Sequence, residues 1–236
     1  MTRPFFYISE YNLSQKEIGL DEDTSRHIVQ VLRMKEEERL NLTDGKGNLI
    51  TAEITDAHKK HCSVKVIDSQ FTSHLSPKIT IAISLLKNTN RFEWFLEKAT
   101  EIGVSEIIPL ICERTEKQKF RYERMKAICI SAMLQSQQTW LPELHELTTF
   151  NHLVIEQSDN SQKLIAHCIE EKKQLLSHLQ IGTSANWLIC IGPEGDFTKQ
   201  EIEHALKNNF IPVSLGETRL RTETAGVVAA TLLRHV

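Results

Sequence analysis

The chain has few glycines and carries none of the common nucleotide-site or metal-site signatures. It contains nine glycines among 236 residues, where average usage near 7% would give about 16. No Gly-x-Gly-x-x-Gly, Walker A or Gly-x-Ser-x-Gly string occurs, which argues against a dinucleotide-binding fold, a P-loop NTPase and a serine hydrolase. Cys-x-x-Cys pairs are absent and the ten histidines are scattered, so we expect no metal site.

Disulfides, membrane spans and an export signal are not expected either. The five cysteines are odd in number and far apart, unlike a disulfide framework. No run approaches the roughly 18 consecutive apolar residues of a membrane span, and the N-terminal segment lacks the apolar core of a secretory signal. We therefore expect a reduced, cytoplasmic protein with no membrane partner. The net charge of −3, with 40% hydrophobic residues, excludes a disordered chain and a polycationic nucleic-acid coat protein.

The first 70 residues predict a small β-rich unit with one helix. The helix is expected over residues 21–34, with Ile28, Val31 and Leu32 on one face. The turn signal Asp44-Gly45-Lys46-Gly47 follows, and it is typical of a hairpin. Strands are expected at 39–43, at 48–54 and around Cys62, Val64 and Val66. The polar segment 69–78 predicts a linker.

The remainder alternates strands and helices, the pattern of an α/β domain with a parallel sheet. Strands are expected at 79–86, 104–111, 163–168, 187–192 and 211–216. Helices are expected from a cap at Asn90 to a stop at Gly103, and at 118–138, 171–180 and 223–235, with a further one starting at Lys199.

Residues 113–126 form a basic segment. They hold six basic and three acidic groups, with Phe120 and Tyr122 between them. Basic groups meet phosphates and aromatic rings stack on unpaired bases, so this segment suits RNA. The alternative is the solvated start of a helix.

Residues 192–201 form a rigid loop and a helix start directly after a buried strand. Gly192 and Gly195 allow the backbone to approach a ligand closely, and Pro193 stiffens the loop. Thr198 and Glu201 form a Thr-x-x-Glu capping box. This arrangement presents main-chain groups to a ligand at the carboxyl end of a sheet, although a simple tight connection between strand and helix would have the same pattern.

A second charged loop follows the next strand and Gly216. It carries Glu217, Arg219, Arg221 and Glu223 immediately before an apolar helix. A turn held by salt bridges, without any functional site, would also explain these charges. We expect the two loops to follow adjacent strands of the sheet and to share one site.

Four strings in this chain resemble one known family in the correct order. GPEGDFTKQE and SLGETRLRTETA are similar to the signature of the RsmE-type 16S ribosomal RNA uridine-N3 methyltransferases, of the SPOUT class. RHIVQVLRMK with LTDGKGN resembles the N-terminal half of that family, and LEKATEIGVSEIIPLICERT resembles the start of its catalytic domain. The resemblance covers nearly the whole chain.

The resemblance implies a PUA-like RNA-binding β-barrel domain at 1–70 and a SPOUT methyltransferase α/β domain with a deep trefoil knot at 78–236. It implies a homodimer that binds S-adenosylmethionine and acts on 16S rRNA, free or in the assembled small subunit. The implied cofactor residues are Ile191, Gly192, Glu194, Gly195, Leu215, Gly216, Leu220, Arg221, Thr222, Thr224 and Ala225. We expect the adenine to lie against Leu215 and Leu220.

The expected chemistry is an in-line methyl transfer without a metal. Our hypothesis is that Arg221 stabilises negative charge developing on a uracil carbonyl, and that Glu223 is the base or an orienting group. The expected RNA-binding cations are Arg26, Arg33, Lys87, Arg91, Arg114, Lys117, Lys119 and Arg121.

The chain departs from the family pattern at three positions. Asp196 stands where GPEGG has its last Gly, Gln138 where an Arg is frequent, and Glu37 where a Gly often precedes the hairpin. Two other functions stay open on the sequence alone. One is a related methyltransferase acting on a tRNA or a ribose hydroxyl, and the other is a non-catalytic RNA-binding or assembly factor.

Overall fold

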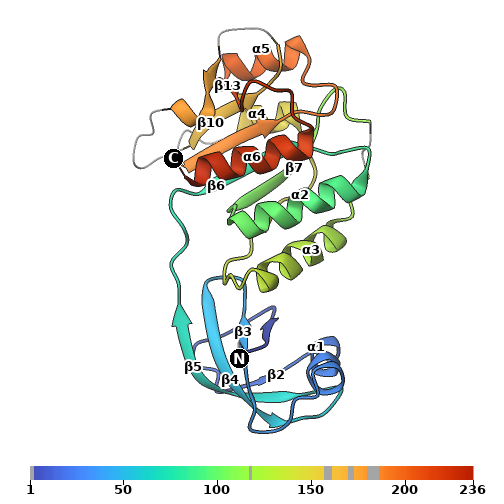
Figure 1. The fold of residues 1–236 in the computed structure, drawn as a ribbon, viewed down its shortest axis with the longest axis vertical. Helices are drawn as coiled ribbons and strands as arrows, with labels where there is room; N and C mark the ends of the chain where they lie inside the picture. Colours follow the sequence, from blue (N-terminus) through green and yellow to red (C-terminus); the bar gives the residue numbers. More distant parts are fainter. Residues whose placement is uncertain (1–2, 117–118, 157–160, 170–172, 180–185, 236) are drawn as a thin grey trace. The chain divides into compact units, whose positions relative to one another are not determined.

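The protein folds as two compact units, which we describe separately (Figure 1). The computed structural model describes residues 3–116, 119–156, 161–169, 173–179 and 186–235. The first unit contains the described residues up to His74 together with Met133–Leu141, and the second contains the others.

The first unit is built on a curled sheet with the strand order β1-β3-β4-β5-β2. The strands are β1 (Phe5–Tyr7), β2 (Glu17–Gly19), β3 (Arg39–Thr43), β4 (Asn48–Asp56) and β5 (Ser63–Phe71). The predicted hairpin is confirmed, since β3 and β4 pair antiparallel across residues 44–47. Ile50, Ala52 and Ile54 alternate inward and are fully buried, as expected of a strand with one core face.

The predicted helix at 21–34 is shorter and irregular. An α-helix, α1 (Glu22–Arg26), continues as a π-helical turn, η1 (His27–Val31), which the Leu32 N–H closes by donating to the His27 carbonyl at 2.9 Å. Ile28 is buried as predicted, but Val31 and Leu32 are exposed, so their predicted core face is wrong. The wider π turn changes the spacing on which that prediction relied.

Residues 133–141 belong to the first unit through Trp140. The Trp140 Nε1–H donates to the Thr72 carbonyl at 2.8 Å, and Lys46 forms a β-bridge with Trp140. Gly47 makes this approach possible, because a Cβ there would lie 2.7 Å from both the Thr72 carbonyl oxygen and the Trp140 ring. Its φ of +95° also favours glycine.

The second unit is built on a parallel sheet. Among its described residues, eight strands pair in the order β11-β13-β10-β12-β6-β7-β8, with β9 beside β7. The strands are β6 (Ile79–Ser84), β7 (Glu106–Ile111), β8 (Glu143–Leu144), β9 (Thr148–Thr149), β10 (Ser161–Ala166), β11 (Gln174–Leu175), β12 (Asn186–Ile191) and β13 (Ile211–Ser214). The predicted α/β class is thus confirmed, because strands and helices alternate around a parallel sheet.

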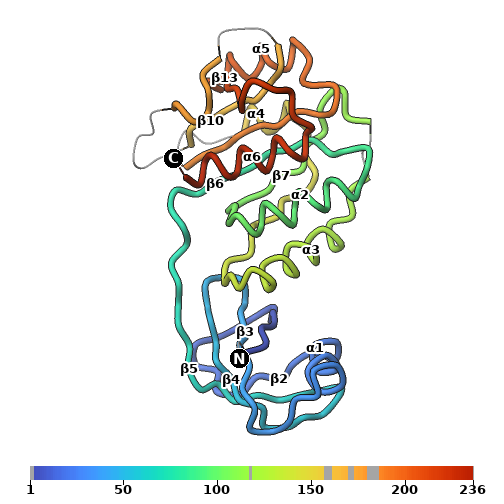
Figure 2. Tube along the Cα trace, viewed as in Figure 1, coloured from blue at the N-terminus to red at the C-terminus, as the bar shows by residue number. Residues whose placement is uncertain are grey.

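Helices cover both faces of this sheet. The α-helices are α2 (Thr89–Ile102), α3 (Tyr122–Gln135), α4 (Phe150–Glu156), α5 (Lys199–Lys207) and α6 (Thr222–Arg234). Helices α2 and α6 lie side by side (Figure 2). Phe150 of α4 and Ile202 of α5 pack in a buried cluster with Leu188 and Cys190 of β12. The sheet is therefore buried on both faces, as its β-branched strands require.

Several predicted boundaries needed correction. Asn88, not Asn90, caps α2, because its extended backbone lets its Oδ1 accept from the Asn90 N–H at 3.0 Å. The proposed linker 69–78 begins later, since β5 pairs with β4 as far as Phe71. The helix predicted at 171–180 is wrong over its described part: residues 174–175 form β11, which pairs with β13, and residues 176–178 form the short 3₁₀ helix η2. The remainder of that prediction lies outside the described residues.

An ion pair near the start of β7 makes stability depend on pH. The Nε2 atom of His145 lies 3.5 Å from Oε2 of Glu106. The Glu106 carboxylate raises the pKa of His145 above 6.5, and His145 lowers the pKa of Glu106 below 4.5. The histidine therefore stabilises the fold fully below pH 6.5, and this stabilisation is lost as pH rises through the folded-state pKa. The glutamate's contribution is present above pH 4.5 and is lost as pH falls through its folded-state pKa.

We expect His145→Gln to flatten the fall in the free energy of unfolding between about pH 6 and pH 8. Urea unfolding at several pH values measures this change. His178→Gln, at an exposed histidine of the same unit, is the matched control. Equal pH dependence in wild type and His145→Gln would contradict the assignment.

Candidate active site

A cavity of about 600 Å³ opens at the carboxyl ends of β10, β12 and β13. The register explains why three loops meet there, because Ala166 at the end of β10 pairs with both Ile191 of β12 and Val213 of β13. The expectation that the two glycine-containing loops follow adjacent strands is wrong, since β10 lies between β12 and β13. Because all three strands are parallel and end together, their loops still border one site.

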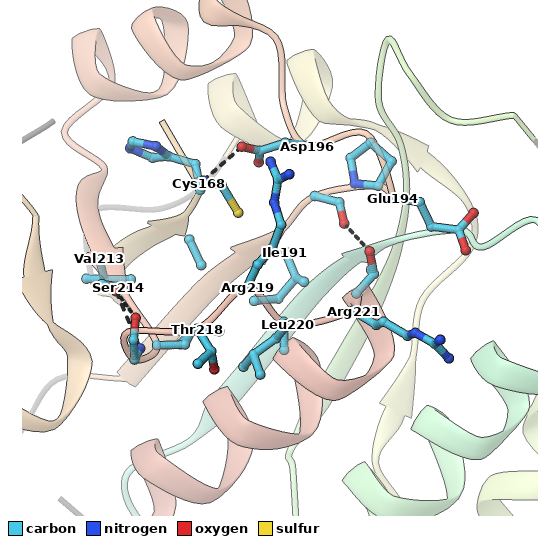
Figure 3. A pocket seen from close by; sticks show the side chains of 18 of the residues that line it. Cys168, Ile191, Glu194, Asp196, Val213, Ser214, Thr218, Arg219, Leu220 and Arg221 are labelled. Atoms are coloured by element: carbon cyan, nitrogen blue, oxygen red, sulfur yellow. Dashed lines mark hydrogen bonds between the residues drawn. The ribbon is translucent and has the colours of Figure 1, made fainter. Parts of the chain in front are cut away.

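Nine of the eleven predicted cofactor residues line this cavity, together with the predicted RNA-binding Arg91 (Figure 3). They are Arg91, Ile191, Gly192, Glu194, Leu215, Gly216, Leu220, Arg221, Thr222 and Ala225. Gly195, Glu223 and Thr224 are not in the lining. Gly195 lies in the loop after β12, and Glu223 and Thr224 lie in the first turn of α6.

The loop after β12 is held rigidly. Its predicted capping box is confirmed: the Thr198 N–H donates to Oε2 of Glu201 at 2.8 Å, and the Glu201 N–H donates to Oγ1 of Thr198 at 3.3 Å. Oγ1 of Thr222 donates to the Gly192 carbonyl at 3.0 Å and so links the loop to α6. A Cβ at Gly192 would lie 3.0 Å from the buried Phe197 ring, so a larger residue would displace this backbone.

Arg91, in the first turn of α2, connects two acidic side chains at the cavity. Its Nη1 donates to Oε1 of Glu194 at 3.1 Å, and its Nε lies 3.6 Å from Oε1 of Glu223. The Glu223 side chain is only 8% exposed, and its buried Oε2 has no hydrogen-bond partner among the residues that the structure describes. The geometry therefore supports an orienting role for Glu223 toward Arg91.

The predicted RNA-binding cations differ in their contacts. Arg114 Nη1 donates to the Gly195 carbonyl at 2.6 Å, which ties the basic segment to the loop after β12. Lys87 pairs with Glu116 at 2.8 Å, and Lys119 and Arg121 are exposed. The predicted Lys117 lies outside the described residues. Arg26, which pairs with Asp23, and the exposed Arg33 lie in the first unit.

Sequence reasoning missed the part of the cavity that follows β10. Its missed lining residues include His167, Cys168 and Lys173. Lys173 Nζ donates to the His167 carbonyl at 2.6 Å. Arg219 extends toward Cys168 and Asp196, whereas Arg221 points to the opposite side (Figure 3); Cys168 and Asp196 raise the pKa of the Arg219 guanidinium. One feature of the sequence could have pointed to this segment: like the two recognised loops, it directly follows a buried strand.

Cys168 differs from the other cysteines in being exposed. Burial raises the pKa of the thiols of Cys62 and Cys129 to about 11 and that of Cys112 to about 12, and it also raises the pKa of Cys190. Thiolates are the reactive form of cysteine, so Cys168 is the expected target of a thiol reagent.

The described part of the chain holds neither a metal-ligating cluster nor a membrane-spanning helix. No group of three or more His, Cys, Asp or Glu side chains there could hold a metal ion. No helix among these residues has the length and apolar character needed to cross a membrane.

Comparison with protein families decides the assignment of the chain. A model described as an RNA methyltransferase domain matches residues 74–234, and one described as an RNA methyltransferase PUA domain matches residues 20–67. The chain belongs to this RNA methyltransferase family. The predicted family is confirmed, as is a PUA-like N-terminal sheet followed by a parallel-sheet domain.

Relatives match this RNA methyltransferase over almost its full length. The ribosomal RNA small subunit methyltransferase E of Rickettsia conorii is 30% identical over 97% of this chain and 93% of that protein. The Bacillus subtilis protein of the same name is 30% identical over 89% of this chain and 86% of its own. The crystal structure of ribosomal RNA small subunit methyltransferase E from Neisseria gonorrhoeae bound to S-adenosyl methionine has a TM-score of 0.88 at 30% identity, covering 99% of this chain and 97% of that one.

Proposed function

We propose that this protein transfers a methyl group from S-adenosylmethionine to N3 of a specific uridine in the 16S rRNA of the small ribosomal subunit. The observation that carries the proposal is the cavity where the loops after β10, β12 and β13 meet, in a chain of an RNA methyltransferase family. The proposal rests further on the match to methyltransferases named for small-subunit rRNA.

The cavity residues fit S-adenosylmethionine. A volume of about 600 Å³ lies within the range of small-molecule sites. Leu215 and Leu220 offer an apolar surface for the adenine, and Gly192 and Gly216 bring main chain to the edge of the cavity. Acidic side chains (Glu194, Asp196, Glu217) and basic ones (Arg91, Lys173, Arg219, Arg221) line it together, so it offers partners both for the cationic groups of the cofactor and for its carboxylate. The bound cofactor supplies an electrophilic methyl group.

The protein's own residues position the acceptor and stabilise its charge. Arg221 lies at the cavity with an exposed side chain, and we assign it to the uracil carbonyl on which negative charge develops when N3 loses its proton. Glu223 holds Arg91 at the cavity; its alternative role as the base stays a prediction. Alignment of sulfur, methyl and N3 requires no metal ion.

The remaining parts of the chain are assigned to RNA binding and assembly. N3 lies on the Watson–Crick edge, so the target uridine must be unpaired or extruded. We assign the domain at 1–70, as a closed PUA-like barrel, and the cations of 113–126 to the surrounding RNA, and residues 78–236 to methyl transfer. The proposal includes a knotted SPOUT domain, a homodimer and, because its substrate is ribosomal, a cytoplasmic location.

A thiol reagent tests cofactor binding directly. N-Ethylmaleimide is expected to alkylate Cys168 selectively, and S-adenosylmethionine at about ten times its Kd is expected to slow this reaction about tenfold. Mass spectrometry of the intact protein and its peptides measures the rate. Methionine at the same concentration is the control. An unchanged alkylation rate together with no calorimetric binding of S-adenosylmethionine would favour a non-catalytic RNA-binding factor.

The reaction itself is tested with labelled cofactor on two substrates, free 16S rRNA and assembled small subunits. Digestion to nucleosides should yield labelled 3-methyluridine. A labelled ribose, or label accepted by tRNA instead, would overturn the proposed target and leave the enzyme class intact.

A further inference from the structure

Asp196 lines the cavity and has a left-handed backbone conformation, which is uncommon for residues other than glycine. Its φ is +64°, in the left-handed region that glycine adopts freely and that aspartate adopts more readily than most residues. The Asp196 N–H donates to the Pro193 carbonyl at 2.9 Å, closing the turn that contains Glu194 and Gly195. The conformation directs the carboxylate toward the loop that follows β10 (Figure 3).

The two carboxylate oxygens of Asp196 have separate backbone partners. Oδ1 accepts from the N–H of Phe197, the next residue, at 2.9 Å. Oδ2 accepts from the N–H of Cys168 at 2.8 Å. Hydrogen bonds to a charged acceptor are stronger than neutral ones, so this side chain joins the loop after β12 to the loop after β10.

A third loop approaches the same carboxylate. Arg219, in the connection from β13 to α6, points toward Cys168 and Asp196, and both groups raise the pKa of its guanidinium. All three residues line the cavity. One carboxylate thus interacts with residues from each loop that borders the site.

We propose that Asp196 is a positioning residue that holds the loop after β10 against the loop after β12 and thereby keeps the cofactor cavity in its binding form. A glycine at this position would adopt the same φ but would offer no acceptor to the Cys168 N–H. The expected effect of Asp196 on cofactor affinity rests on the proposed function, whereas the contact that it makes between the two loops does not.

The experiment uses Asp196→Gly in the full-length protein. Glycine keeps the backbone conformation and removes both acceptors, so amide hydrogen exchange at Cys168 is expected to accelerate about tenfold or more without cofactor. The Kd for S-adenosylmethionine is expected to rise about tenfold, while kcat at saturating cofactor changes little. Asp196→Asn keeps one acceptor oxygen and is expected to give intermediate values for both measurements.

Asn209→Gly is the matched control. Asn209 also has a positive φ, of +65°, but it is exposed in the connection between α5 and β13 and does not line the cavity. It should leave exchange at Cys168 and the cofactor Kd unchanged. Unchanged exchange in Asp196→Gly would overturn the inference even if the cofactor binds. If wild type itself fails to bind S-adenosylmethionine, the proposed function fails while the exchange measurement still decides the loop contact.

Discussion

Replacing Arg221 by alanine is expected to slow methyl transfer by about 10²–10³-fold, the usual cost of removing a group that stabilises transition-state charge. The Kd for S-adenosylmethionine should rise far less than the rate falls, because the other residues that line the cofactor cavity stay in place. The start of α6 should also survive. Arg221 makes no side-chain cap, and its carbonyl still accepts from the Ala225 N–H at 2.8 Å.

Single-turnover transfer to RNA and calorimetry with the cofactor separate these two effects. Arg221→Lys keeps a positive charge without the planar fork and should retain part of the rate. Arg39→Ala, which removes an arginine paired with Glu53 in the first unit, is the control for loss of a cation elsewhere. Unchanged turnover on RNA in Arg221→Ala would remove Arg221 from the mechanism.

The features that could be predicted from the sequence are those fixed by neighbouring residues. The start of α5 follows from Thr198 and Glu201, which satisfy each other's backbone N–H groups within one turn. The end of α2 follows from Gly103, whose φ of +85° suits glycine. The first of these signals ends the loop after β12, which borders the cavity.

The features that could not be predicted depend on pairing between distant segments. The position of β10 between β12 and β13 is a choice of strand order, and nothing near residue 166 in the sequence encodes it. As a result the loop with Cys168 and Lys173 was missed, although it borders the cavity. The placement of Trp140 in the first unit has the same origin, since its partner Thr72 lies 68 positions earlier.

Two departures from the family pattern acquire a physical meaning from the backbone. Glu37 and Asp196 stand where glycine is usual in the resembling family, and both have a positive φ, of +71° and +64°. The chain therefore places a residue with a Cβ in the left-handed region at both positions and accepts strain there. At Asp196 the added carboxylate makes two backbone contacts in return; nothing in the structure assigns a comparable contact to the Glu37 side chain.

Gly226→Val is expected to lower the free energy of unfolding of the second unit by about 3 kcal/mol. A Cβ at Gly226 would lie 2.6 Å from the Phe95 ring of α2 and 3.0 Å from Cδ1 of Ile83 in β6. Phe95 and Ile83 are fully buried, so neither can move aside without disturbing the sheet. Gly226→Ala should cost less, because alanine adds only the Cβ and favours a helix over glycine by about 1 kcal/mol.

Urea unfolding followed by circular dichroism measures the loss, and Thr231→Val on the exposed side of α6 is the control for introducing valine into this helix. Equal stability of Gly226→Val and Thr231→Val would show that α2 and α6 tolerate separation.

The packing of α6 against α2 also affects the cofactor site. Ala225, the residue before Gly226, lines the cavity, and Thr222 one turn earlier bonds to the Gly192 carbonyl. Because α6 carries both residues, displacing it from α2 should weaken S-adenosylmethionine binding as well as the fold.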